Sequence, residues 1–171
     1  VVDGVESTIA IPFTEKGVVF WYTGFMVDDD GTKFNELLAV NPDGNGDITG
    51  TNVLWKKRDE LSQNQMLTPV IKDGLIYTVN TKNILMCIDA TTGEEIWSTH
   101  VTSNYNASPI YINGNIWFFS VKGEVLVIKA GRKYEVVANN QMDSGIWATP
   151  AILRNSVIMR TQKYLYRIGR E

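Results

Sequence analysis

The chain contains few of the residues that form disulfides and metal centres. Its 171 residues include one cysteine, Cys87, and one histidine, His100. A single cysteine excludes an internal disulfide and a zinc site built on several cysteines, and a single histidine excludes a histidine-rich metal site. No apolar run approaches the roughly 18 residues that a membrane-spanning helix needs, so the sequence predicts no membrane span.

An excess of positive charge is also missing. Lys and Arg together number 16 and Asp and Glu 19, which gives a net charge of −3. Dispersed cations on an acidic chain do not form the basic surface that nucleic acid requires, so we expect no nucleic-acid partner. The chain is rich instead in apolar residues, which make up 44% of it. That fraction is enough for a packed core and excludes a disordered chain.

A repeat built around proline runs through the sequence. Four of the five prolines recur in one context, and these are Pro12, Pro69, Pro109 and Pro150. Five residues after each proline stands a residue that tolerates a tight turn, namely Gly17, Gly74, Gly114 and Asn155. The spacing from Pro69 to Pro109 and on to Pro150 is about 40 residues, a period typical of propeller blades.

Each repeat unit contains short apolar runs separated by turn residues. In the second unit the runs are 68–72, 75–80, 84–89 and 95–99, rich in Ile, Val, Tyr and Trp. Such runs predict β-strands, and four of them in about forty residues predict one blade of a β-propeller. Trp97 lies in the last run, and counting along the third unit predicts Val137 at the same position.

The predicted fold is therefore all-β, a single partial β-propeller of four-stranded antiparallel blades that covers residues 1–171. The four blades are expected at about 5–60, 64–101, 104–138 and 145–169, and the last ends after its third strand. We expect an open C-terminal half of a larger propeller. The remaining blades of the same protein, or a second copy of the chain, would complete it.

One segment carries a resemblance to a known family. Asp89-Ala-Thr-Thr-Gly-Glu-Glu-Ile-Trp97 resembles the Asp-x-x-Thr-Gly-x-x-x-Trp blade motif of the pyrroloquinoline-quinone-type propellers. That family includes quinoprotein alcohol dehydrogenases, the outer-membrane assembly lipoprotein B and exported propellers without an assigned function. The resemblance implies an exported protein that is periplasmic or associated with the outer membrane. Within the motif we interpret Asp89, Thr92, Gly93 and Trp97 as structural residues of a turn and of blade packing.

Candidate binding residues lie just before the repeat prolines. In a propeller these connections share one face with the turns between the second and third strands of each blade. The candidates at this channel rim are Asn64, Gln65, Asn104, Tyr105, Asn106 and Trp147. An alternative interpretation is that they solvate the channel mouth and cap strand starts.

A second candidate site is a weak calcium loop at Asp43, Asn45 and Asp47, where oxygen-bearing side chains alternate. The spacing departs from a calcium loop at once, because its sixth position is Ile48 and its twelfth is Leu54. We therefore favour a solvated turn and expect no metal site.

The function predicted from these features is a non-catalytic binding or scaffold propeller that recognises a protein or a glycan through its rim. No catalytic residue is nominated. Two alternatives remain open, a carbohydrate-active enzyme and a quinone-dependent enzyme. A carbohydrate-active enzyme is disfavoured because few acidic residues lie near the predicted rim, and Asp143 is the acidic residue nearest to it. For a quinone-dependent enzyme, the resemblance implies that many members carry a pair of adjacent cysteines. The lone Cys87 cannot form such a pair. We therefore expect no cofactor and no bound pyrroloquinoline quinone.

Overall fold

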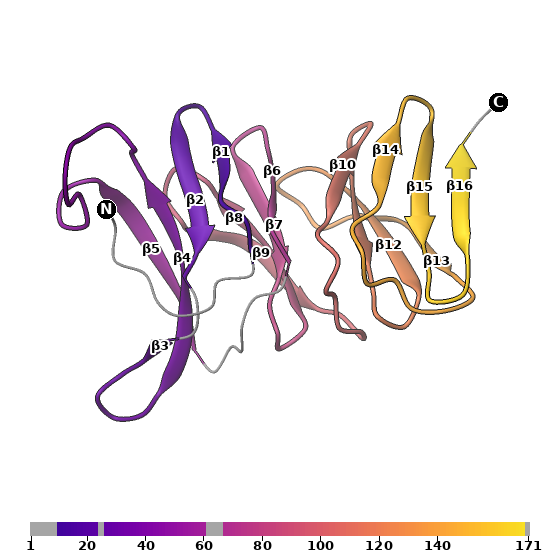
Figure 1. The fold of residues 1–171 in the computed structure, drawn as a ribbon, viewed down its shortest axis with the longest axis horizontal. Helices are drawn as coiled ribbons and strands as arrows, with labels where there is room; N and C mark the ends of the chain where they lie inside the picture. Colours follow the sequence, from indigo (N-terminus) through magenta and orange to yellow (C-terminus); the bar gives the residue numbers. More distant parts are fainter. Residues whose placement is uncertain (1–9, 24–25, 61–66, 170–171) are drawn as a thin grey trace.

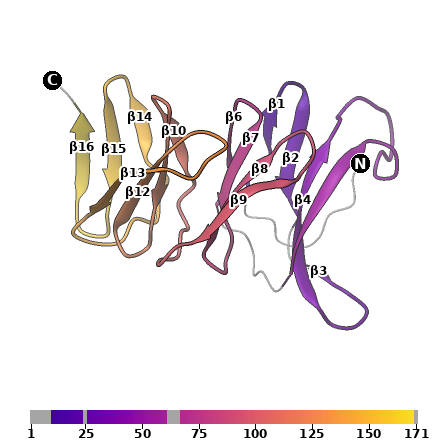
Figure 2. The same cartoon turned by 180° about the vertical axis from the view of Figure 1, so that it is seen from behind.

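The computed structural model describes residues 10–23, 26–60 and 67–169. Over these residues the chain is all-β, with sixteen strands in four antiparallel sheets. Figures 1 and 2 show the sheets standing side by side in chain order, and we number them as blades 1 to 4. The described part of the chain contains no helix that could cross a membrane. The predicted all-β class and the blade-like sheets are confirmed.

The strands follow the repeat. Blade 1 contains β1 (Phe13–Glu15), β2 (Val18–Tyr22), β3 (Met26–Val27), β4 (Lys33–Val40) and β5 (Val53–Glu60). Blade 2 contains β6 (Val70–Lys72), β7 (Leu75–Val79), β8 (Ile84–Asp89) and β9 (Glu95–His100). Blade 3 contains β10 (Ile110–Ile112), β11 (Asn115–Phe119), β12 (Glu124–Lys129) and β13 (Val136–Gln141). Blade 4 contains β14 (Ala151–Leu153), β15 (Ser156–Arg160) and β16 (Leu165–Gly169).

Blade 1 differs from the predicted four strands because it has a fifth, the short β3. Met26 and Val27 of β3 pair with Phe34 and Lys33 at the start of β4. The hairpin that joins β3 to β4 is closed by a hydrogen bond of 2.9 Å from the main-chain N–H of Gly31 to the carbonyl oxygen of Asp28. Extra residues at a turn lengthen the hairpin without disturbing the sheet, because they remain at the surface.

Hydroxyl groups before the repeat prolines join successive blades. The main-chain N–H of Ile11 donates to Oγ1 of Thr68 (2.8 Å), and that of Thr68 donates to Oγ of Ser108 (2.9 Å). The N–H of Ser108 donates in turn to Oγ1 of Thr149 (2.9 Å). In blades 1 to 3 the innermost strand therefore follows a hydrogen bond to the next blade, which gives the Ser/Thr-Pro pairs of the repeat a structural role.

The core consists of the layers between blades, because side chains alternate between the two faces of each sheet. In blade 2, Tyr77, Leu85 and Cys87 pack toward blade 3. Ile76 and Ile88 of the same strands pack toward blade 1. Burial raises the pKa of the Cys87 thiol to about 12, so it serves as a small apolar core residue.

The tryptophan of the repeat belongs to the fourth strand of a blade. Trp55 lies opposite Ala39 and Trp97 lies opposite Cys87. In blade 3 the residue opposite Val127 is Ala138. The prediction that Val137 takes this position was wrong, because the connection from β12 to β13 is one residue longer than that from β8 to β9.

Candidate functional site

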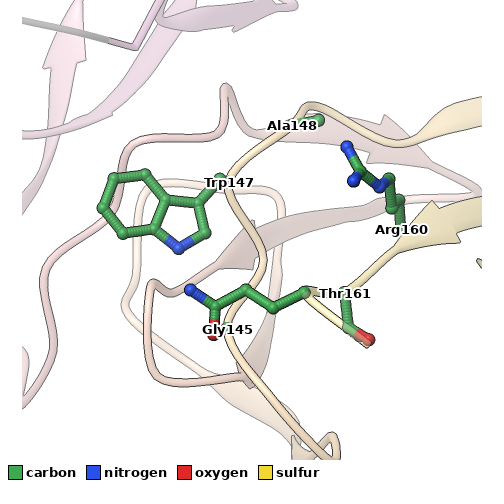
Figure 3. Close-up of a pocket in the computed structure, with 6 residues that line it drawn as sticks. Gly145, Trp147, Ala148, Arg160 and Thr161 are labelled. Carbon is green, nitrogen blue, oxygen red and sulfur yellow. The ribbon is translucent and has the colours of Figure 1, made fainter. Parts of the chain in front are cut away.

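A cleft of about 280 Å³ opens at the loop ends between blades 3 and 4 (Figure 3). One side comes from the connection between β13 and β14, and the other from the end of β15 and the turn that follows it. The lining residues are Gly145, Trp147, Ala148, Arg160, Thr161 and Gln162. Figure 3 shows the indole of Trp147 and the side chain of Arg160 on either side of the segment that leads to Ala148.

The connection that carries Trp147 is fixed on both sides. A Cβ atom at Gly145 would lie 2.1 Å from the carbonyl oxygen of Val121, so the close approach requires glycine. The carbonyl oxygen of Gly145 accepts a hydrogen bond from the N–H of Gln162 (3.0 Å), and the N–H of Ile146 donates to the carbonyl oxygen of Ser120 (3.0 Å). Ile146 is fully buried, whereas Trp147 beside it is 54% exposed. The fold thus holds a large apolar side chain in solvent on a rigid support.

The opposite side of the cleft is a repeated turn. Oγ1 of Thr161 accepts hydrogen bonds from the N–H groups of Lys163 (3.3 Å) and Tyr164 (3.1 Å). Ser120 in blade 3 and Asn80 in blade 2 hold their turns in the same way. Because the side chain of Thr161 is committed to this turn, it positions its neighbours instead of presenting a free hydroxyl to the cleft.

Asp143 ties the same connection to β16. Its carboxylate accepts hydrogen bonds from the phenol of Tyr166 (2.9 Å) and the hydroxyl of Ser144 (3.1 Å). Desolvation opposes ionisation of this carboxyl group, but the hydrogen bonds from Tyr166, Thr161 and Ser144 outweigh it and lower the pKa of Asp143. Asp143 is therefore a charged anchor of the connection at neutral pH.

The lining of the cleft offers apolar, cationic and amide groups. None of its lining residues is a Ser, Cys, His, Asp or Glu that could serve as nucleophile or general base. Trp147 provides apolar contact, Arg160 a guanidinium and Gln162 an amide. This set suits a polypeptide surface with apolar and polar or acidic groups.

The predicted rim residues lie in different surroundings. Trp147 lines the cleft, whereas Tyr105 is 7% exposed and donates its phenol proton to Oε2 of Glu124 (3.1 Å). Burial raises the pKa of Tyr105, which keeps the phenol protonated as a donor. Asn104 is exposed and Asn106 half-buried, and neither lines the cleft. Asn64 and Gln65 fall outside the described residues.

Sequence reasoning missed Arg160 and Gln162. The predicted rim consisted only of segments before the repeat prolines, although turns between second and third strands lie on the same face. The turn after β15 was therefore a signal that could have pointed to both residues. Arg160 and Gln162 line the cleft because the turn after β15 lies against the β13–β14 connection. The hydrogen bond from the N–H of Gln162 to the carbonyl oxygen of Gly145 holds the two segments together.

The loop of the weak calcium candidate, Asp43, Asn45 and Asp47, contains hydrogen bonds between its side chains and its own main chain. Oδ1 of Asn41 accepts from the N–H of Asp43 (3.0 Å), and Oδ1 of Asp47 accepts from the N–H of Thr49 (2.9 Å). Among the residues described, no group of three or more His, Cys, Asp or Glu side chains could hold a metal ion. The solvated turn and the lack of a metal site stay predictions.

The motif residues of blade 2 make contacts between blades. Asp89 accepts hydrogen bonds from the N–H of Thr91 (3.0 Å) and from the guanidinium of Arg132 in blade 3 (3.0 Å). The indole N–H of Trp97 donates to the carbonyl oxygen of Gly131 (3.2 Å). Within the turn, Oγ1 of Thr92 accepts from the N–H of Glu94 (3.2 Å).

The middle of the chain, which contains blades 2 and 3, matches a known protein family. The family model described as "Outer membrane protein assembly factor BamB" matches residues 33–143. The chain belongs to the BamB family. Its structural neighbours are β-propeller proteins, which confirms the predicted propeller fold.

Relatives of the chain include BamB proteins and a dehydrogenase. BamB from Nitrosomonas eutropha is 30% identical over 103 residues, which is 56% of this chain and 25% of that protein. The 1-butanol dehydrogenase (cytochrome c) from Thauera butanivorans is 25% identical over 71 residues, 42% of this chain and 10% of the enzyme. The crystal structure of BamB from Moraxella catarrhalis superposes with a TM-score of 0.63 at 12% identity, covering 89% of this chain and 40% of that one. The chain thus spans a quarter or less of the length of these two curated relatives.

Proposed function

We propose that this chain is the protein-binding part of a propeller that acts in outer-membrane protein assembly, and that it uses the Trp147 cleft to contact a partner. The observation that carries the proposal is the exposed indole of Trp147 on a connection fixed by buried Ile146 and by the bond from Gln162 to Gly145. Exposed aromatic side chains on rigid supports are the usual energetic centres of protein interfaces. Membership in a family of outer-membrane protein assembly factors supports a protein partner over a glycan.

The proposed setting is the periplasm, at the outer membrane, because the relatives are named as outer-membrane assembly factors. A non-catalytic role is supported by a cleft that lacks a nucleophile and a general base. The proposal therefore assigns binding to Trp147, Arg160 and Gln162 and no chemical step to any residue.

The test compares two substitutions of equally exposed apolar residues. Trp147→Ala removes the 54% exposed indole, and Leu54→Ala removes a 55% exposed side chain of β5 in blade 1. Binding of the full-length protein to the outer-membrane assembly machinery of the same organism is measured by biolayer interferometry. We expect Trp147→Ala to weaken binding by about tenfold or more, in line with about 2 kcal/mol for an interface centre, and Leu54→Ala to leave it unchanged. Equal effects of the two substitutions would contradict the proposal.

A further inference from the structure

A lysine occupies the same position in the turns that join the second and third strands of blades 2, 3 and 4. The three residues, which we call the lysine row, are Lys82, Lys122 and Lys163. The main-chain N–H of each donates to a side-chain oxygen two positions earlier, on Asn80 (3.0 Å), Ser120 (3.2 Å) and Thr161 (3.3 Å). These hydrogen bonds use only the main chain of the lysine. The turn therefore does not require a lysine side chain, although each blade has one there.

The side chains of the lysine row lie in solvent without an ion pair. All three residues are exposed. Over residues 10–23, 26–60 and 67–169, no carboxylate forms an ion pair with any of them. Glu124 is two residues from Lys122, yet its carboxylate accepts hydrogen bonds from the phenol of Tyr105 (3.1 Å) and the amide of Asn139 (2.8 Å). The nearby acid is thus engaged elsewhere, and the ammonium groups face solvent.

Lys122 shows that this exposure persists when both neighbouring connections are in place. The N–H of Val121 donates to the carbonyl oxygen of Asn104 (2.9 Å) in the connection between blades 2 and 3. The carbonyl oxygen of Gly123 accepts from the N–H of Met142 (2.8 Å) in the connection between blades 3 and 4. Lys122 remains exposed although both segments pack on its turn. The fold therefore presents this lysine to solvent on a rigid support.

The spacing of the lysine row matches an extended polypeptide. Figures 1 and 2 show the turns after β7, β11 and β15 at the same end of their sheets as the β13–β14 connection. Sheets that pack face to face lie about 10 Å apart, and an extended chain advances about 3.3 Å per residue. About every third residue of such a chain can therefore meet one lysine. The row leads to the Trp147 cleft, because Lys163 directly follows Gln162 of the cleft lining.

The β3–β4 hairpin of blade 1 indicates what kind of anion fits the face. Its tip contains Asp28, Asp29 and Asp30, and the ion pair of Asp28 with Arg58 leaves two carboxylates there. Figures 1 and 2 show this hairpin extending beyond the turns of the other blades. A flat anionic surface, such as a layer of lipid headgroups, would meet these carboxylates first, and like charges repel. A polypeptide segment is narrow enough to follow the lysine row and avoid the hairpin.

We propose that the lysine row binds an extended acidic segment of a partner protein, with carboxylates at about every third residue beside the three ammonium groups. The inference rests on the proposed protein-binding function and specifies the chemistry of the partner that reaches the Trp147 cleft. Exposed charges at the margin of an interface mainly raise the association rate and fix the register, whereas an aromatic centre slows dissociation. The lysine row thus aligns the segment, and Trp147 retains it.

The first test compares two exposed lysines of blade 3 in the full-length protein. Lys122→Glu reverses a charge of the lysine row, and Lys133→Glu makes the same change in the β12–β13 turn, on the opposite face. Association with the outer-membrane assembly machinery is measured by biolayer interferometry. We expect Lys122→Glu to lower the association rate constant about fivefold at low salt. Lys133→Glu and Lys122→Arg should retain the parent rate.

Salt provides a second readout of the same comparison. Raising the salt from about 0.05 M to about 0.5 M should bring the rates of Lys122→Glu and the parent protein together, because salt screens exposed charges. Equal rates of Lys122→Glu and Lys133→Glu at low salt would overturn the proposal. A difference between them that salt does not reduce would also overturn it.

A synthetic peptide tests the lysine row without the machinery. The probe has Glu at every third position with Ser and Thr between, and an isomer has its Glu residues adjacent. Each is titrated into isotopically labelled full-length protein, and the amide resonances of the lysine row are followed. We expect saturable shifts with the spaced probe and several-fold weaker binding of the isomer. Lys122→Glu should weaken binding of the spaced probe to a similar extent. Absence of shifts, or equal binding of the isomer, would overturn the proposal.

Other occupants and the cleft function give different results. Binding to phosphatidylglycerol vesicles in preference to the peptide would assign the lysine row to a membrane and overturn the proposal. A dimer that Lys122→Glu abolishes in sedimentation velocity would assign it to the acidic hairpin of a second copy, with the same consequence. Trp147→Ala should leave peptide binding unchanged, because the probe has no group for the cleft. An effect of Trp147→Ala on machinery binding without one of Lys122→Glu would refute the lysine row alone, and the reverse would refute the cleft alone.

Discussion

Trp55 of blade 1 and Gly93 of blade 2 are in close contact across the boundary between the two blades. A Cβ atom at Gly93 would lie 2.7 Å from the indole ring of Trp55, and Gly93 has a φ of 75°. The indole N–H of Trp55 donates to the carbonyl oxygen of Ala90 (3.0 Å). The tryptophan of blade 1 thus packs directly against the glycine of the motif in blade 2.

Replacement of Gly93 is expected to destabilise the protein strongly. Gly93→Ala introduces both a clash with an aromatic ring and a strained positive φ, and we expect a loss of about 3 kcal/mol in the free energy of unfolding. Gly114→Ala is the matched control, because Gly114 has a φ of 85° and no atom within 4 Å of the new Cβ. It should cost about 1 kcal/mol from backbone strain alone. Urea unfolding measures both values, and equal losses would contradict the contact with Trp55.

The hydroxyl bonds between blades lead to a second prediction. Ser108→Ala removes the acceptor of the N–H of Thr68, and we expect a loss of about 1 kcal/mol in unfolding free energy. Ser108→Thr keeps the hydroxyl and should be close to neutral. Ser98→Ala, at an exposed position of β9, is the control and should cost less than about 0.5 kcal/mol. Thermal unfolding compares the variants, and a neutral Ser108→Ala would show that the bond does not join the blades.

Asp89 makes stability depend on pH. The hydrogen bonds from Arg132 and from the N–H of Thr91 lower the pKa of Asp89 below the ordinary 3.8. Since the folded pKa is the lower one, Asp89 contributes stability above pH 3.8 that is lost as the pH falls through the folded pKa. We expect Asp89→Asn to flatten the acid limb of a plot of unfolding free energy against pH. An unchanged acid limb would contradict the ion pair with Arg132.

Quinone binding tests the dehydrogenase alternative, which the match to the 1-butanol dehydrogenase supports. The full-length protein is titrated with pyrroloquinoline quinone and calcium, and its melting temperature is recorded. A ligand that binds the native state raises the melting temperature. We expect no rise, and a saturable rise would replace the binding proposal with an enzymatic one.

The repeat could be predicted from the amino-acid sequence, because it arises from short-range chemistry. Turn residues such as Asp73 and Gly74, with φ of 53° and 76°, close hairpins wherever they stand between apolar runs. Strand positions and their alternation follow from the same short-range pattern, so the all-β blades could be predicted.

The contacts between residues of different strands and blades depend on the tertiary structure. One extra residue between β12 and β13 put Ala138 and not Val137 opposite Val127. Tyr105 and Trp147 both precede a repeat proline, yet Tyr105 is buried and Trp147 is exposed. Arg160 reached the cleft because its blade packs beside the β13–β14 connection. Strand register and packing between blades bring together residues that are far apart in the chain, and no local sequence pattern encodes these contacts.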